Sequence, residues 1–90
     1  DLDGKRVLDI GSNLGETSRN ALSCGASLVH GVEYDALFVL LADLISIYNN
    51  LPADKIRFEQ NDVTKRFSFD ATYDAIMAFS VFTYIETRLE

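Results

Sequence analysis

The feature that most constrains the fold is an alternation of strand-length apolar runs with segments of helical length. The apolar runs predict strands over residues 6–10, 28–33, 55–60 and 73–79. Between them, a helix is predicted over residues 16–24, closed by Gly25 in a left-handed cap. A second helix is predicted from an N-cap at Asp35 to Tyr48, and a last helix begins near Thr83. Parallel strands need long crossover connections, so this order predicts an α/β fold with a parallel sheet.

The strand patterns also predict the order of the sheet. The first, second and fourth runs are almost continuously apolar, as in strands buried on both faces, whereas residues 55–60 alternate and suit an edge. Right-handed crossovers then give the Rossmann-like order 3-2-1-4, with helices on both faces. The fourth strand has the composition of a covered strand, so we expect the sequence to stop before further C-terminal strands.

Size and charge exclude several classes of protein. Ninety residues, 48% of them hydrophobic, fit a single domain, residues 1–90, with one core. Eight basic against fourteen acidic side chains give a net charge of −6, which disfavours binding to a nucleic acid backbone. The longest apolar run, residues 36–42, is far shorter than the ~20 residues of a membrane-spanning helix.

The single cysteine and the start of the chain set expectations about its origin. Cys24 has no partner for an internal disulfide and no neighbours at metal-ligand spacing, so no metal site is predicted, and a reducing, cytoplasmic location is expected. The sequence begins at Asp1 with no basic and apolar leader. We therefore expect a part of a longer gene product without a secretory signal.

The most informative motif is residues 7–15, VLDIGSNLG, where an acid near the end of a buried strand precedes a glycine-spaced turn into a helix. Gly11 and Gly15 are expected to let a ligand lie against the backbone. Asn13 stands where a glycine is expected, and asparagine tolerates a positive φ. Burying the Asp9 carboxylate costs several kcal/mol unless it is paired, so it should meet backbone donors or a cationic ligand group. A purely structural Asp9 is the alternative.

Acids also follow the second and third strands. Glu33 ends the second strand, where a carboxylate can accept from two ribose hydroxyls at about 1.5–3 kcal/mol each. After the third strand, Asp62 is placed to accept from the amine of adenine, and the Val63 N–H to donate to a ring nitrogen. The simpler alternatives are a solvated acid at Glu33 and a turn-forming residue at Asp62.

Because of these motifs, residues 5–85 resemble the cofactor-binding half of class I S-adenosylmethionine-dependent methyltransferases. The resemblance implies that the methionine part of S-adenosyl-L-methionine lies on Asp9 and the turn formed by Gly11, Ser12, Asn13 and Gly15. It implies that Glu33 binds the ribose, that Tyr34 covers one face of the adenine, and that Asp62 and Val63 bind its edge. It also places Phe79, at the end of the fourth strand, toward the methionine and the substrate.

The resemblance implies a transferase that moves a methyl group to an unidentified acceptor. No general base is evident, and the family's substrate-side residues are expected after Glu90 or in an N-terminal cap, so catalysis by these residues alone is not expected. A non-catalytic binding module stays open as an alternative.

An NAD-dependent Rossmann oxidoreductase is a further alternative. Its G-x-G-x-x-G fingerprint needs glycines at positions 11, 13 and 16, which hold Gly11, Asn13 and Glu16. The Glu16 carboxylate at the helix start would repel a pyrophosphate.

The second helix is apolar on more than one face. The stripe predicted to cover the sheet consists of Leu37, Leu41, Leu44, Ile45 and Tyr48. A second apolar surface consists of Phe38, Val39, Leu40 and Ile47. We expect another subunit or a further segment to pack on this second surface.

His30, in mid-strand, is predicted to be a packed or hydrogen-bonded residue rather than a catalytic base.

Overall fold

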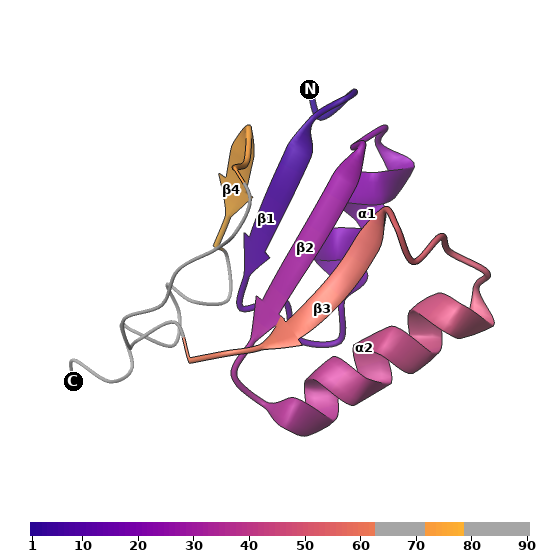
Figure 1. Ribbon diagram of the computed structural model, residues 1–90, viewed down its shortest axis with the longest axis vertical. Helices are drawn as coiled ribbons and strands as arrows, with labels where there is room; N and C mark the ends of the chain where they lie inside the picture. The colour runs from indigo at the N-terminus through magenta and orange to yellow at the C-terminus, as the bar shows by residue number, and fades with distance from the viewer. Residues whose placement is uncertain (63–71, 79–90) are drawn as a thin grey trace.

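The predicted strands and helices are present in a computed structural model of the chain, which describes residues 1–62 and 72–78 (Figure 1). The elements are β1 (Arg6–Ile10), α1 (Glu16–Ser23), β2 (Leu28–Glu33), α2 (Ala36–Tyr48), β3 (Ile56–Gln60) and β4 (Ala75–Met77). The predicted bounds agree to within two residues. The helix predicted near Thr83 lies outside the described residues.

All four strands are parallel, and their order is β3-β2-β1-β4, which confirms the predicted topology. Asp9 pairs with Gly31, and Glu33 with Gln60, so β1, β2 and β3 end along one edge of the sheet. Candidate ligand-binding residues on three separate segments are thereby brought to the same edge.

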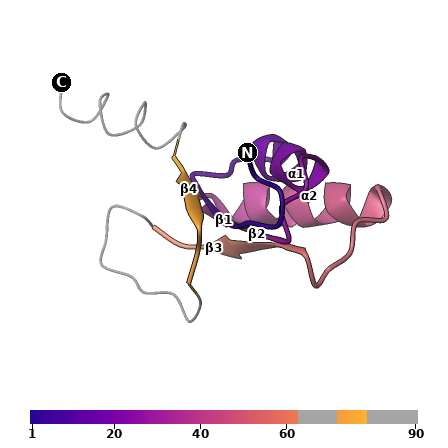
Figure 2. The same ribbon diagram turned by 90° about the horizontal axis from the view of Figure 1, so that it is seen from above.

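Both described helices lie on the same face of the sheet (Figure 2). The chain moves in one direction from β1 to β2 to β3, and two successive right-handed crossovers in that direction leave their helices on one side. The sequence predicted helices on both faces, and the helix predicted near Thr83 lies outside the described residues.

The core lies between the sheet and α1. Val7, Val29 and Ile56 point from three adjacent strands toward Ala21 and Ala26 and are almost completely buried. Gly25, with φ of 100°, ends the helix in the left-handed conformation that the sequence predicted. This packing fixes the position of α1, and with it the turn that enters the helix.

Helix α2 packs on the sheet through a different stripe from the one predicted. Its buried residues are Ala42 and Ser46. Of the predicted stripe only Ile45 is half-buried, and the other four residues are exposed. Phe38 and Val39, predicted to face outward, are half-buried. The small residues Ala42 and Ser46 therefore lie on the side of α2 that faces β2 and β3, and the four leucines of the helix lie on its exposed side.

The strand β4 occupies the edge of the sheet opposite β3. Its Ile76 is largely exposed, as expected for an apolar strand with no neighbour on one side within the described residues. Among the described helices, none has the length and apolar character to cross a membrane.

Candidate functional site

The turn after β1 is built from three residues in the left-handed backbone region. Gly11, Asn13 and Gly15 have φ of 74°, 52° and 86°. The N–H groups of Gly11 and Ser12 donate to the carbonyl of Val32 at 2.8 and 3.0 Å, which fixes the turn to the end of β2. The prediction that Asn13 adopts a positive φ in this turn is therefore confirmed.

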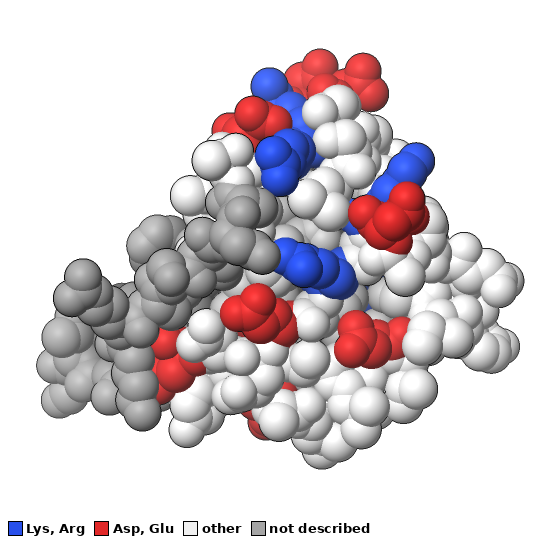
Figure 3. Space-filling model, in the orientation of Figure 1, with Lys and Arg blue, Asp and Glu red and all other residues white. Residues whose placement is uncertain are grey.

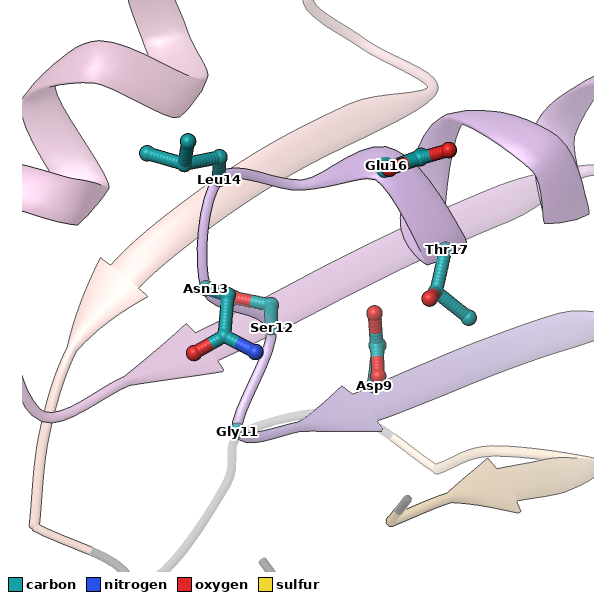
Figure 4. Close-up of a pocket in the computed structure, with 7 residues that line it drawn as sticks. All are labelled: Asp9, Gly11, Ser12, Asn13, Leu14, Glu16 and Thr17. Atoms are coloured by element: carbon teal, nitrogen blue, oxygen red, sulfur yellow. The ribbon is translucent and has the colours of Figure 1, made fainter. Parts of the chain in front are cut away.

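A cavity of about 230 Å³ lies between this turn and the start of α1 (Figure 4). Its lining residues are Asp9, Gly11, Ser12, Asn13, Leu14, Glu16 and Thr17. The lining, which is made of described residues, includes two acids and no lysine or arginine. Pockets for whole drug-sized ligands have about 300–1,000 Å³, so this cavity suits one end of such a ligand, and a cationic end best.

Asp9 points from β1 toward the start of α1 (Figure 4). Its side chain is buried, with the residue 3% exposed, and its Oδ2 accepts a hydrogen bond of 2.6 Å from the hydroxyl of Ser18. Burial raises the pKa of Asp9, the Ser18 hydrogen bond lowers it, and the nearby charge of Glu33 raises it further. Asp9 thus holds a destabilised charge beside the cavity, where a cationic group would be favourable.

The partner of Asp9 was not predicted. The sequence led us to expect backbone donors or a ligand, and the donor is instead a side-chain hydroxyl from the first turn of α1. The available signal was Ser18 itself, a polar residue on the helix face that meets the strand.

Glu33 connects the ends of β1 and β2. Its Oε1 accepts from the Asn13 N–H at 2.8 Å, and its Oε2 accepts from the Asp35 N–H at 2.9 Å. The residue is 7% exposed, which excludes the alternative of a solvated strand-end acid. It does not line the cavity. Each carboxylate oxygen has a second lone pair, so both can still accept from a ligand hydroxyl.

Ser12 carries the clearest unsatisfied group of the site. It is 4% exposed, and within the part of the chain that the structure describes its Oγ has no hydrogen-bond partner. Buried hydroxyls are nearly always paired, so an orphan one in a cavity wall indicates a missing polar partner. The site therefore fits a ligand with polar groups at the end that enters the cavity.

Gly15 has a packing role that was not predicted from the sequence. A Cβ at Gly15 would lie 2.6 Å from Cζ of Phe58, and Gly15 is not among the residues that line the cavity. A Cβ at Gly31 would lie 2.5 Å from Cδ1 of the same ring. Both glycines thus make room for Phe58 under the turn. Sequence reasoning missed Phe58, although a glycine in mid-strand is a signal of such a close approach.

The residues predicted to bind the adenosine lie beside this turn. The Asn61 N–H donates to the Glu33 carbonyl at 2.9 Å, and the Gln60 amide donates to the Tyr34 carbonyl at 2.8 Å. Tyr34 is exposed and Asp62 is half-buried, and neither lines the cavity. The other two predicted contacts, Val63 and Phe79, are outside the described residues.

His30 is part of a separate cluster. The ring is 1% exposed, its Nδ1 lies 2.6 Å from the Tyr73 hydroxyl, and its Nε2 lies 3.2 Å from Oε1 of Glu59. Because side chains alternate along β2, His30 faces away from the side that carries Gly31 and Glu33. The prediction of a packed, hydrogen-bonded histidine is confirmed. Within residues 1–62 and 72–78, no cluster of ligand side chains could hold a metal ion.

The fold is similar to the folds of several solved proteins. An S-adenosylmethionine-dependent methyltransferase from Mesorhizobium loti has 25% identity and a TM-score of 0.71, over 86% of this chain and 33% of that chain. Protein arginine methyltransferase 10 from Arabidopsis thaliana has 26% identity and a TM-score of 0.75, over 86% and 21%. The (4+2)-cyclase SpnF has 22% identity and a TM-score of 0.71, over 82% and 27%.

These matches confirm the resemblance predicted from the sequence. The chain has the Rossmann-like fold of the N-terminal half of class I S-adenosylmethionine-dependent methyltransferases. It spans one third or less of the length of the three solved proteins. No protein-family model matches the sequence, and no curated protein matches it significantly.

Proposed function

We propose that residues 1–90 form a single partial domain that binds S-adenosyl-L-methionine in a methyltransferase with an unidentified acceptor. The observation that carries this proposal is the acidic cavity beside Asp9, with the unpartnered hydroxyl of Ser12 in its wall. The methionine end of S-adenosylmethionine has an ammonium, a sulfonium and a carboxylate but no phosphate. Its two positive charges outweigh the single negative one, so this end suits the acidic lining.

The proposed cofactor residues fall into two groups. The methionine end is held by the carboxylates of Asp9 and Glu16, by the Ser12 hydroxyl and by the backbone carbonyls of Gly11 and Asn13. The N–H groups of Gly11 and Asn13 already donate within the protein. The adenosine is held outside the cavity, along the edge formed by β2 and β3. There the second lone pairs of Glu33 accept from the ribose hydroxyls, Tyr34 lies on the adenine, and Asp62 and Val63 contact its edge. Phe79 is proposed near the methionine.

The reaction proposed for the whole enzyme is an in-line displacement. When bound, S-adenosylmethionine supplies a methyl group on a positively charged sulfur. In such a transfer, a lone pair of the acceptor would bond to the methyl carbon, and the electron pair of the broken carbon–sulfur bond would return to sulfur. Positioning can supply about 7–11 kcal/mol of such a barrier, so the contribution of this chain is to hold and orient the cofactor. Its residues provide no assigned catalytic group.

Two other functions of the chain are alternatives to cofactor binding in a methyltransferase. A non-catalytic binding module is one alternative, since the fold also occurs in a cyclase and a fold alone does not determine an activity. An NAD-dependent oxidoreductase is disfavoured because Glu16 lines the cavity where a pyrophosphate would lie.

The free, exposed Cys24 supports the proposal of a reducing, cytoplasmic location.

The charges on the surface bear on the acceptor. On the face shown in Figure 3, basic and acidic side chains are interspersed and form no continuous basic area. With the net charge of −6, this supports the proposal that these residues do not themselves bind a nucleic acid.

Isothermal titration calorimetry of the chain with S-adenosylmethionine, S-adenosylhomocysteine and NAD tests the proposal. Binding of both sulfur compounds, with S-adenosylmethionine the tighter because its sulfonium is charged, is expected. Binding of NAD alone would favour the oxidoreductase. Binding of none of the three would favour the non-catalytic module.

A further inference from the structure

The outward face of α2 carries a regular apolar seam. Leu37, Leu40, Leu44 and Ile47 follow one another at spacings of three, four and three residues, the a and d positions of a heptad pattern. Leu41 and Tyr48 flank this seam on the same side. We refer to these six residues as the α2 seam. None of them is needed to attach α2 to the sheet, because Ala42 and Ser46 make that contact.

The α2 seam is as large as the largest apolar patches of monomeric proteins. Its six side chains are between 36% and 86% exposed. Together they present on the order of 600 Å² of apolar area, at the upper limit of the largest patch of a typical monomer. A standard interface takes ~800 Å² from each partner, so the seam and its rim approach what one side of a stable interface needs.

The arrangement of the seam is self-complementary. If a second α2 packs antiparallel across a two-fold axis, Leu37 lies opposite Ile47 of the other copy, and Leu40 lies opposite Leu44. Each of these four positions then meets another leucine or isoleucine, which is what the contact between identical surfaces in a two-fold dimer requires. Antiparallel packing also brings opposite ends of the two helix dipoles together. We propose that two copies of this chain associate through the α2 seam.

The charges around α2 disfavour a membrane as the occupant. Helices that lie on anionic membranes carry lysine and arginine along their polar face, and α2 has neither. The charged side chain of α2 is Asp43. A net charge of −6 would further oppose approach to anionic lipid.

Sedimentation velocity and light scattering of the full chain at micromolar concentrations test the proposal. The expected mass is twice the 10.1 kDa of one chain. The variant Leu40→Gln/Leu44→Gln should be a monomer with an unchanged circular dichroism spectrum, because both side chains are exposed and outside the core. The control Ile76→Gln removes an equally exposed apolar side chain from β4 and should remain a dimer.

Disulfide cross-linking tests the direction of packing in a Cys24→Ser background. Leu37→Cys/Ile47→Cys should form a covalent dimer on mild oxidation, whereas Leu37→Cys alone should not. Cross-linking by the single variant would indicate parallel helices and overturn the proposed two-fold arrangement.

Three other outcomes would overturn the dimer itself. They are a monomeric wild-type chain, a dimer that persists in Leu40→Gln/Leu44→Gln, and a monomer that binds phosphatidylcholine vesicles through the seam. None of these results depends on cofactor binding, so the proposed function is tested separately.

Discussion

Oε1 of Glu33 accepts a hydrogen bond of 2.8 Å from the backbone N–H of Asn13, twenty residues earlier in the chain. This bond joins the last residue of β2 to the middle of the turn after β1. The other oxygen, Oε2, accepts from Asp35 at the start of α2. One carboxylate therefore positions two backbone segments and, in the proposed function, also faces the ribose.

The first prediction concerns this carboxylate. In Glu33→Gln, the amide nitrogen must face the N–H of either Asn13 or Asp35, so two donors oppose each other. We expect the affinity for S-adenosylhomocysteine to fall more than tenfold, about 1.4 kcal/mol or more. We also expect the free energy of unfolding to fall by about 1–3 kcal/mol. Calorimetry and urea denaturation measure the two effects.

The matched control is Asp54→Asn, which removes a negative charge from an exposed loop. It should leave both quantities unchanged. If Glu33→Gln behaves like this control, Glu33 has neither role.

Asp9 should show a conflict between stability and binding. Its pKa is raised in the folded state, mainly by burial, so the stabilising, protonated form is lost as the pH rises through the folded-state pKa. In Asp9→Asn, the amide oxygen still accepts from Ser18 and no charge is buried. We expect Asp9→Asn to unfold at a higher temperature than the wild type at pH 7 and to bind S-adenosylmethionine more weakly.

The pH dependence provides the check. The stability gain of Asp9→Asn should shrink as the pH is lowered from 7 toward 4, because the wild-type carboxyl then takes up its proton. A gain that is constant with pH would show that the buried charge of Asp9 does not cause it.

Ser12 and Ser46 form a natural pair for comparison. Both have a buried Oγ with no hydrogen-bond partner among the described residues, but only Ser12 lines the cavity. Ser12→Ala and Ser46→Ala should therefore have similar, small effects on thermal stability. Only Ser12→Ala should weaken binding of S-adenosylhomocysteine, by about 0.5–1.5 kcal/mol. Equal affinities of the two variants would remove the Ser12 hydroxyl from the site.

The substitution Gly15→Ala tests the packing of Phe58 under the turn. In Gly15→Ala, the new methyl group meets Phe58 at 2.6 Å and the backbone has an unfavourable positive φ. Gly4→Ala has a comparable φ of 72° but nothing within 4 Å, so it measures the backbone effect alone. We expect Gly15→Ala to be more destabilising than Gly4→Ala by about 1–3 kcal/mol in urea denaturation. Phe58→Leu should recover part of this difference.

The helices and strands and their order in the sheet could be predicted from the sequence, because the residues that mark the ends of these elements act locally. Alternating apolar runs, the N-cap at Asp35 and the stop at Gly25 mark the ends of elements, and each was found. The order of the strands followed from the handedness of crossovers and from the alternating pattern of β3. These features depend on neighbouring residues or on general rules of topology.

The face of α2 could not be predicted in the same way. We assigned the stripe of large apolar residues to the sheet, whereas the helix packs through Ala42 and Ser46. How closely a helix approaches a sheet depends on the side chains of both, and a helix that is apolar on most sides gives no local signal for this choice.

The site was predicted in outline but not in its internal contacts. The positions of Asp9 and Glu33 at adjacent strand ends followed from the motifs. The bond from Ser18 to Asp9 and the packing of Phe58 on Gly15 and Gly31 join residues that are distant in the sequence, so a single sequence does not reveal them.

The most direct test of the central claim is a two-dimensional ¹H–¹⁵N NMR titration of the chain with S-adenosylhomocysteine. The proposed site predicts saturable shifts at the amides of Gly11, Ser12, Asn13, Tyr34 and Asp62. The amides of Gly4 and Ser27, at the other end of the sheet, should not move. Shifts at that other end, or no shifts at saturating ligand, would contradict the proposal that the acidic strand ends form one cofactor site.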